Sequence, residues 1–251
     1  MTRLSFDQTM RAWQEREPSL PARNLPNRFA AMAACIKAFT ALAQAVKSNK
    51  SQRVQGGLMR EFVRLLALMV YQYPQRSISR GIATNYPPGP CTRCTKLPCR
   101  CPPGEFKWIW PTIKPEWLRE SVYSIQVRMR KTYHGGNMLN GGRWNVLSRT
   151  FLEIHEALDN DLQDLAREVA LLAAGEVSRL NADPDGNRDQ DDLLHKDVEF
   201  GDVALWLAVL ANALDLELAT HADPAWDATR FVYPDETPLA RGEFEEAEAS
   251  E

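Results

Sequence analysis

The sequence predicts an all-α fold. Apolar residues recur at spacings of three and four through most of the chain, which is the period of helices that face a core. Convincing strand patterns, in which apolar and polar residues alternate, are absent from the sequence. With 251 residues, of which 44% are hydrophobic and 25% charged, the chain is long enough for one large domain or two small ones.

Residues 1–77 are predicted to form an N-terminal helical region. A short helix is expected in FDQTMRAWQERE, and two longer helices in RFAAMAACIKAFTALAQAVK and LMREFVRLLALMVYQY. The loop SNKSQRVQGG separates the longer two, and Pro74 ends the second of them. Cys35 stands alone in the alanine-rich helix, so we expect it to be a small core residue.

Residues 78–115 are predicted to form an irregular, proline-rich connector. Its segment CTRCTKLPCRC places four cysteines within eleven residues, namely Cys91, Cys94, Cys99 and Cys101. Four thiolates at this spacing predict a structural Zn²⁺ site that ties the loop together, and an iron–sulfur cluster is the alternative. With all four ligands supplied by the protein, no open position for catalysis would remain on the ion.

Residues 116–233 are predicted to form a second helical domain. Helical periodicity returns at PEWLRESVYSIQVRMRKTY, continues almost throughout RWNVLSRTFLEIHEALDNDLQDLAREVALLAAGEVSRL, and ends in VEFGDVALWLAVLANALDLEL. The polar stretch NADPDGNRDQDD before the last helix is expected to be a loop. Residues 234–251 are acidic and are expected to form a disordered tail.

Two carboxylates lie at the predicted start of the last helix. Glu199 and Asp202 are three residues apart and therefore share one helix face. The helix macrodipole explains Glu199, since it stabilises negative charge at a helix N-terminus by about 0.3–1 kcal/mol. It explains Asp202 less well, because Asp202 lies beside an apolar stripe, where a carboxylate is costly unless it is paired or bound to metal.

A second pair with the same spacing occurs in FLEIHEAL. Glu153 and Glu156 are embedded there among apolar residues. Two helices that present such pairs to a common interior would form an oxygen-ligand site, which suits Mg²⁺ or Mn²⁺. Ions held in this way engage phosphate groups and activate water for attack at phosphorus.

The two pairs resemble the MazG group of all-α nucleoside triphosphate pyrophosphatases. The resemblance rests on Glu153-x-x-Glu156 followed by Glu199-x-x-Asp202, which runs on as DVALWLAVLANALDLEL, and it covers at most residues 120–233. It implies a MazG-like helical bundle that dimerises and hydrolyses nucleoside triphosphates to monophosphate and pyrophosphate, with water as the nucleophile at the α-phosphorus. It also implies that the four acids bind Mg²⁺ and that one of them orients or deprotonates the water.

The length of chain between the two acidic pairs leaves open whether they lie close together in space. An unbroken helix from Glu156 to Leu180 would extend for 24 residues, or about 36 Å, and would bring Glu199 back near Glu176 instead. Either the helix breaks near residues 159–161, or Glu168 takes the place of the first pair. The sequence does not distinguish these alternatives.

Basic residues near the acidic helices are candidates for binding substrate phosphates. The nearest in sequence are Lys131, Arg143, Lys196 and Arg230, and Arg230 lies where MazG-like domains often place basic residues. Each of them is also typical of an ordinary solvated surface charge.

The N-terminal helices also raise the question of an internal repeat. REFVRLLALMVYQ aligns with VEFGDVALWLAVLAN, so that Glu61 matches Glu199 and Arg64 matches Asp202. Two apolar helices can align this well by chance, and the sequence leaves a degenerate repeat open. With Arg64 in place of an acid, such a copy would not be catalytic.

Composition restricts the remaining classes of protein. A net charge of −3 disfavours a general nucleic-acid binder, although nucleic acid is kept as a less favoured partner. The sequence predicts no membrane span and no signal peptide, and hence a cytoplasmic protein. The competing hypothesis is a non-catalytic, zinc-containing module that binds nucleic acid or a protein partner, in which the acids are relics.

Overall fold

The structure of the chain is a computed structural model, which describes residues 4–17, 25–71, 76–89, 112–133, 143, 145–158 and 190–226. These residues form helices and turns without a β-strand, and the one β-type contact among them is an isolated bridge between Ser5 and Ser121. The predicted all-α fold is therefore confirmed for the described part of the chain.

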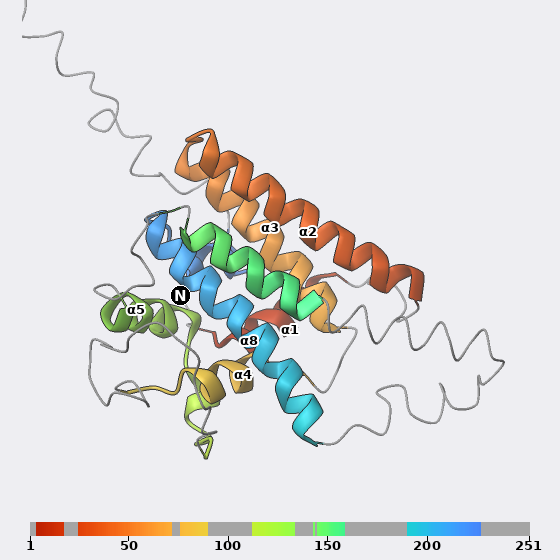
Figure 1. Ribbon diagram of the computed structural model, residues 1–251, viewed down its shortest axis with the longest axis vertical. Coiled ribbons are helices and arrows are strands. Elements are labelled where there is room, and N and C mark those ends of the chain that lie inside the picture. The colour runs from red at the N-terminus through yellow and green to blue at the C-terminus, as the bar shows by residue number, and fades with distance from the viewer. Residues whose placement is uncertain are drawn as a thin grey trace, which may run out of the picture.

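The N-terminal region consists of α1 (Phe6–Arg16), α2 (Leu25–Lys47) and α3 (Gln52–Tyr71). α1 begins with a capping box, in which Ser5 and Gln8 exchange backbone and side-chain hydrogen bonds. α2 and α3 lie side by side as an antiparallel hairpin (Figure 1). α3 begins at Gln52, so the predicted loop before it is shorter than expected and Gly56 lies inside the helix.

A packing contact explains this helical glycine. A Cβ atom on Gly56 would lie 2.3 Å from Cε1 of the buried His221, so only glycine allows the imidazole to pack on the backbone of α3. His221 belongs to the short helix α9 (Leu218–Ala222), near the C-terminal end of the described chain. Arg60 of α3 donates to the backbone oxygens of Asp223 and Pro224 just beyond it. The C-terminal segment thus docks on the N-terminal helices.

The middle of the chain contributes α4 (Ile78–Asn85), the 3₁₀ turn η1 (Trp117–Arg119) and α5 (Val122–Tyr133). The prediction that the connector is irregular from residue 78 onward is wrong at its beginning, because α4 is a helix. Ser77 caps it by accepting a hydrogen bond from the amide of Arg80. Asp7 of α1 accepts a further bond from the amide of Ser79.

The longest described helix is α8 (Gln190–Ala213). The predicted loop before it is too long, since its last three residues, 190–192, already belong to α8. A further helix spans 145–158 and lies beside α8, where it is drawn in bright green in Figure 1. α8 therefore extends about two turns beyond the apolar stretch from which it was predicted.

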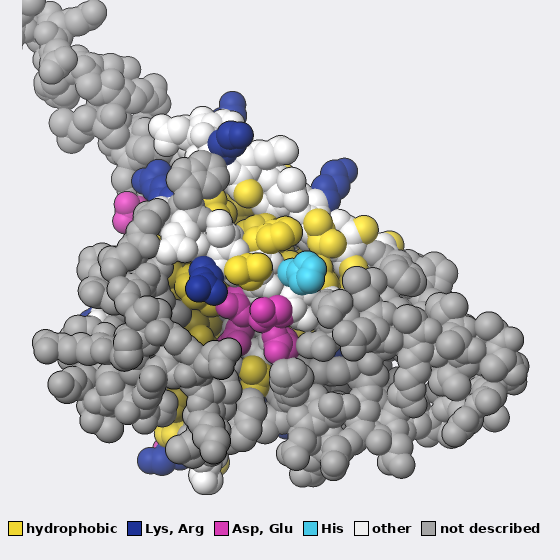
Figure 2. All heavy atoms as spheres, in the orientation of Figure 1, with side chains coloured by type: hydrophobic (Ala, Val, Ile, Leu, Met, Phe, Trp, Pro, Cys, Tyr) yellow, Lys and Arg dark blue, Asp and Glu magenta, His cyan; other side chains and the backbone are white. Residues whose placement is uncertain are grey.

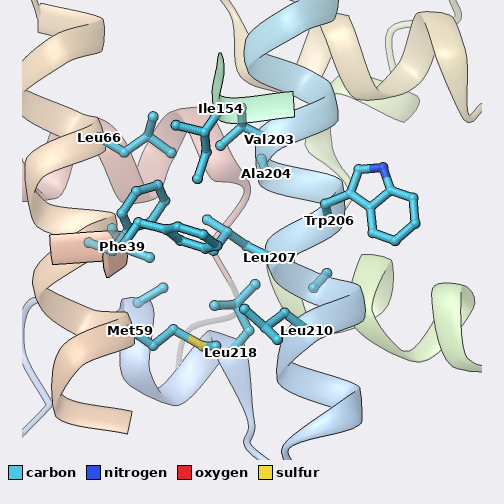
Figure 3. Close-up of a cluster of buried hydrophobic side chains, with 14 of the residues drawn as sticks. Phe39, Met59, Leu66, Ile154, Val203, Ala204, Trp206, Leu207, Leu210 and Leu218 are labelled. Carbon is cyan, nitrogen blue, oxygen red and sulfur yellow. The ribbon is translucent and has the colours of Figure 1, made fainter. Parts of the chain in front are cut away.

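One hydrophobic core joins the helices. Figure 3 shows Phe39 of α2 and Leu66 of α3 meeting Ile154 of the helix 145–158 and Leu207 of α8. Side chains from the predicted N-terminal region and from the predicted second domain therefore belong to the same cluster. Burial of this shared apolar surface fixes the helix 145–158 against α8.

The backbones of α4 and α8 approach each other closely where the two helices cross. A Cβ atom on Gly81 would lie 1.8 Å from the backbone oxygen of Asp197, and one on Gly201 would lie 2.6 Å from the backbone carbon of Gly81. The two backbones are therefore in direct contact, which only glycine permits at these positions. Asp197, whose side chain is buried, accepts from the amide of Ser77 at 2.9 Å and from Nε of Arg80 at 2.5 Å.

α5 is attached to the same assembly through one buried amide. Gln126 donates to the side chain of Asn212 and to the backbone oxygen of Leu216, and its Oε1 accepts from the amide of Leu218 at 2.8 Å. Asn212 returns a hydrogen bond to the backbone oxygen of Gln126. Because each polar atom of the Gln126 amide has a partner, the burial of this side chain does not leave desolvated groups unpaired.

One stretch of α2 is apolar enough to cross a membrane by length and composition, although the sequence was expected to contain none. It spans Ala30–Lys47, with a mean hydropathy of 1.2, and 44% of it is buried within the protein. Phe39 and Leu42, both in this stretch, belong to the shared core. The core of a folded protein accounts for such a helix equally well, and the cytoplasmic location stays a prediction.

The close contact of α4 and α8 at Gly81 and Gly201 predicts that one added methyl group there lowers the stability of the protein. Gly201→Ala should destabilise the protein by at least about 2 kcal/mol, since its Cβ would overlap the backbone of α4. Gly57→Ala is the matched control, because a Cβ on Gly57 meets nothing within 4 Å and alanine should stabilise α3 by about 0.5–1 kcal/mol. Urea denaturation of both variants measures the difference. Equal effects of the two substitutions would contradict the close crossing.

Candidate functional site

The structure brings the two predicted acidic pairs together. Glu153 and Glu156 lie on the helix 145–158, and Glu199 and Asp202 lie on α8. The charges of the other three acids all raise the pKa of Asp202, so the four carboxyl groups are within electrostatic reach of one another. Figure 2 shows acidic side chains gathered on this face of the molecule, beside a histidine and a basic side chain.

The geometry bears on the choice between Glu153 with Glu156 and Glu168 as partners of the acids on α8. Glu153 and Glu156 do approach Glu199 and Asp202, so the pairing does not require Glu168. The described part of the first acidic helix ends at residue 158, and Glu168 and the sequence at 159–161 lie outside the described residues.

The macrodipole does not account for the acids on α8. Because α8 begins at Gln190, Glu199 follows its first residue by nine positions, and Asp202 lies still further along. The dipole acts within about the first turn of a helix. Glu199 and Asp202 therefore lie in the interior of the helix. The prediction that they lie at its start is wrong.

Asp202 is held by a neutral partner from another helix. Both of its carboxylate oxygens accept hydrogen bonds from Nδ2 of Asn85, the last residue of α4, at 2.9 and 3.0 Å. Burial is the main cause that raises the pKa of Asp202 well above its ordinary value, and the bonds from Asn85 oppose this shift. Among the described residues, no Lys or Arg forms an ion pair with Asp202.

Glu153 is held in a similar way. It accepts a hydrogen bond from the side chain of Trp206, whose buried indole lies on the other side of α8 from Leu207 (Figure 3). Burial, followed by repulsion from Glu156 and Glu199, raises the pKa of Glu153 to about 7. The remaining two acids differ in exposure, since Glu199 is partly buried and Glu156 is exposed.

The donor chemistry of the cluster fits a hard cation. All four candidate ligands are carboxylates, and oxygen-only ligation suits Mg²⁺ or Mn²⁺. In the described part of the chain, no three His, Cys, Asp or Glu side chains are arranged to hold an ion as they stand. Neighbouring carboxylates repel one another, and convergence on an ion would need side-chain rotation from this arrangement. The backbone already places the two pairs on facing helices.

A buried acceptor supports the same interpretation. Asn85 is 8% exposed, and its Oδ1 accepts no hydrogen bond from the described residues. Its Nδ2 is committed to Asp202. An orphaned buried oxygen costs on the order of 1–3 kcal/mol, which a bound ion with its waters would offset.

The predicted phosphate-binding residues remain predictions. Lys131 is exposed at the end of α5 and Arg143 is exposed as well. The side chain of Lys196 and the whole of Arg230 lie outside the described residues. Arg149, one turn before Glu153 on the same helix, was missed, although its charge lowers the pKa of Glu153. Its four-residue spacing from Glu153 was the signal that would have found it.

Two further residues of the site were missed or undervalued. Asn85 lies in a segment predicted to be irregular, and no local pattern links it to Asp202, which is 117 positions later in the chain. Trp206 follows Asp202 by one helical turn, and its role as a donor to Glu153 depends on the packing of a second helix. Both contacts are products of tertiary structure.

The cysteine predictions divide into two groups. The predicted Zn²⁺ ligands Cys91, Cys94, Cys99 and Cys101 lie outside the described residues, so the zinc site stays a prediction. Cys35 is buried in the core, as expected, and its burial raises the pKa of the thiol to about 12. It is therefore a packing residue with little thiolate at neutral pH.

Arg64 has a structural role in the candidate repeat. It donates to Glu61 on its own helix and to Glu17 after α1. The ion pair with Glu17 joins the end of α1 to α3, and whether the N-terminal helices are a true repeat stays open.

Comparisons with models of known families, with curated proteins and with solved structures find no match to this chain.

The pKa of Glu153 predicts how stability depends on pH. Since this pKa is raised in the folded state, folding binds a proton between about pH 4.5 and 7, and stability falls as pH rises through that window. Glu153→Gln removes the charge. Its free energy of unfolding, relative to that of the unsubstituted, metal-free protein, should therefore rise by about 1–3 kcal/mol from pH 5 to pH 8.

Urea titrations at the two pH values measure this difference, with the exposed Glu116→Gln as control. A difference between Glu153→Gln and the parent that does not change with pH would contradict the raised pKa.

Proposed function

We propose that this protein is a Mg²⁺-dependent nucleoside triphosphate pyrophosphohydrolase of the MazG-like type, which releases nucleoside monophosphate and pyrophosphate. The observation that carries the proposal is the approach of Glu153 and Glu156 to Glu199 and Asp202 from a second helix. Side chains with a purely structural role rarely gather four carboxyl groups in one place, because burial and mutual repulsion lower stability.

Two of the four carboxylates have an identified donor on a neighbouring helix. Asn85 fixes the orientation of Asp202, and Trp206 restrains Glu153. These two acids, together with Glu199, would hold the cation. When bound, Mg²⁺ would supply neutralisation of phosphate charge and activation of water.

Glu156 is the acid best suited to the attacking water. It is exposed, whereas the other three members of the cluster are partly buried. An exposed carboxylate reaches solvent and can accept a hydrogen bond from water near a substrate phosphate. In this proposal Glu156 orients the water or takes its proton, and attack at the α-phosphorus releases pyrophosphate.

Positive charge near the cluster would help to bind the triphosphate. Arg149 acts on Glu153 from the same helix, and both Arg149 and Arg143 are exposed. Lys131 is a further exposed candidate, at the end of α5. Lys196 and Arg230 keep the phosphate-binding role proposed from the sequence.

The proposal predicts pyrophosphate release by the purified protein in Mg²⁺. Glu199→Gln and Asp202→Asn should each lower kcat/KM by about 100-fold or more, because each removes an acid proposed to hold the cation that neutralises charge at the reacting phosphate. Glu116→Gln is the control. Glu116 is exposed and is distant in the sequence from all four acids, so this variant should retain activity. A coupled pyrophosphate assay with the common ribo- and deoxynucleoside triphosphates measures the rates.

The proposal is wrong if no common triphosphate yields pyrophosphate at rates above those of the Glu199→Gln variant. Salt-dependent binding of RNA or DNA that survives both acid substitutions would then favour the non-catalytic binding module.

A further inference from the structure

Helix α4 ends against the acidic cluster, and its last residue contacts Asp202. Gly81 and Asn85 are four residues apart and therefore lie on the same face of α4. Gly81 contacts the backbone of α8 at Asp197 and Gly201, so Asn85 is placed one turn further along the same contact. The amide of Asn85 reaches both oxygens of Asp202 as a consequence of this crossing.

We propose that Asn85 is a positioning residue of the cation site, which it serves by fixing the carboxylate of Asp202 without neutralising it. This inference rests on the proposed function of the acidic cluster and extends the site to a helix outside the MazG-like segment. α4 is then part of the functional site, and the N-terminal half of the protein is required for cation binding.

A contrast between two acids on α8 supports this role. Asp197 faces the beginning of α4, where Arg80 supplies a guanidinium at 2.5 Å. Asp202 faces the end of the same short helix, where the donor is the uncharged amide of Asn85. The guanidinium neutralises Asp197 within the fold, whereas the amide orients Asp202 and leaves its negative charge available to a cation.

Two other carboxylates of the described chain follow the first pattern. Glu120 forms a salt bridge with Arg128 at 2.6 Å, and Glu61 forms one with Arg64 at 2.7 Å. Asp202 is buried more deeply than Glu61, so a purely structural role would favour a charged partner for it. The neutral amide of Asn85 is explained if a bound cation supplies the positive charge that compensates Asp202.

The side-chain oxygen of Asn85 also supports a cation as the ligand. Its Oδ1 is buried and has no donor among the described residues, while Nδ2 is used by Asp202. Mg²⁺ binds to proteins with several of its waters retained, and these waters are hydrogen-bond donors. A fixed acceptor next to a fixed carboxylate suits a hydrated cation better than a bare one.

The test compares Asn85→Leu with Asn212→Leu in the full-length protein. Both asparagines form hydrogen bonds between α8 and another helix. Asn85 of α4 bonds to Asp202, whereas Asn212, near the end of α8 and beyond the acidic cluster, bonds to Gln126 of α5. Asn85→Leu should weaken Mn²⁺ binding, measured by electron paramagnetic resonance, about 10- to 100-fold. Asn212→Leu should lower the melting temperature and leave the Mn²⁺ affinity unchanged.

Ion selectivity gives a second readout, which a loss of stability alone would not change. A loosened Asp202 should weaken Mg²⁺ more than Ca²⁺, because Mg²⁺ demands the more rigid geometry. Competition of each ion with Mn²⁺ measures the ratio. An unchanged ratio together with unchanged Mn²⁺ affinity in Asn85→Leu would overturn the role of Asn85.

Asn85→Gln and Asn85→Met keep the experiment decisive if leucine prevents folding. Their side chains have the same length, and only glutamine retains an amide donor. Tighter Mn²⁺ binding by Asn85→Gln than by Asn85→Met supports the inference, and equal binding overturns it. Absence of Mn²⁺ binding by the unsubstituted protein would instead overturn the proposed function.

Discussion

The contact between the backbones of α4 and α8 is the constraint on which the site depends. Gly81 and Gly201 let the two helices approach without intervening side chains. At this separation a short amide such as Asn85 spans the gap to Asp202. With any larger residue at the crossing, the helices would separate and the end of α4 would leave the acidic cluster.

A second constraint is the core that joins the helix 145–158 to α8. Ile154 lies between Glu153 and Glu156 in the sequence and points into the cluster that also contains Val203 (Figure 3). Burial of these apolar side chains fixes the acids near one another against their repulsion. The protein thus maintains an unfavourable charge arrangement with its hydrophobic core, as is typical of sites where function outweighs stability.

The sequence predicted the helical class and identified two acidic pairs that the fold brings near each other, because helical period and pair spacing are both short-range patterns. The three-residue interval in Glu153 and Glu156 is visible without knowledge of the fold. The start of α8 was misplaced because the polar residues from Gln190 onward are helical here, although their composition is typical of a loop. The partnership of Asn85 with Asp202 had no sequence signal, since it depends on a crossing between distant segments.

The central claim is that two facing helices hold one hard cation between their acid pairs. Crystals of the protein grown with Mn²⁺ and measured by anomalous diffraction test it most directly. The account predicts an anomalous peak between the helix 145–158 and α8, within bonding distance of carboxylates from both. A crystal structure in which the acids stay apart and no peak lies between these helices would contradict it.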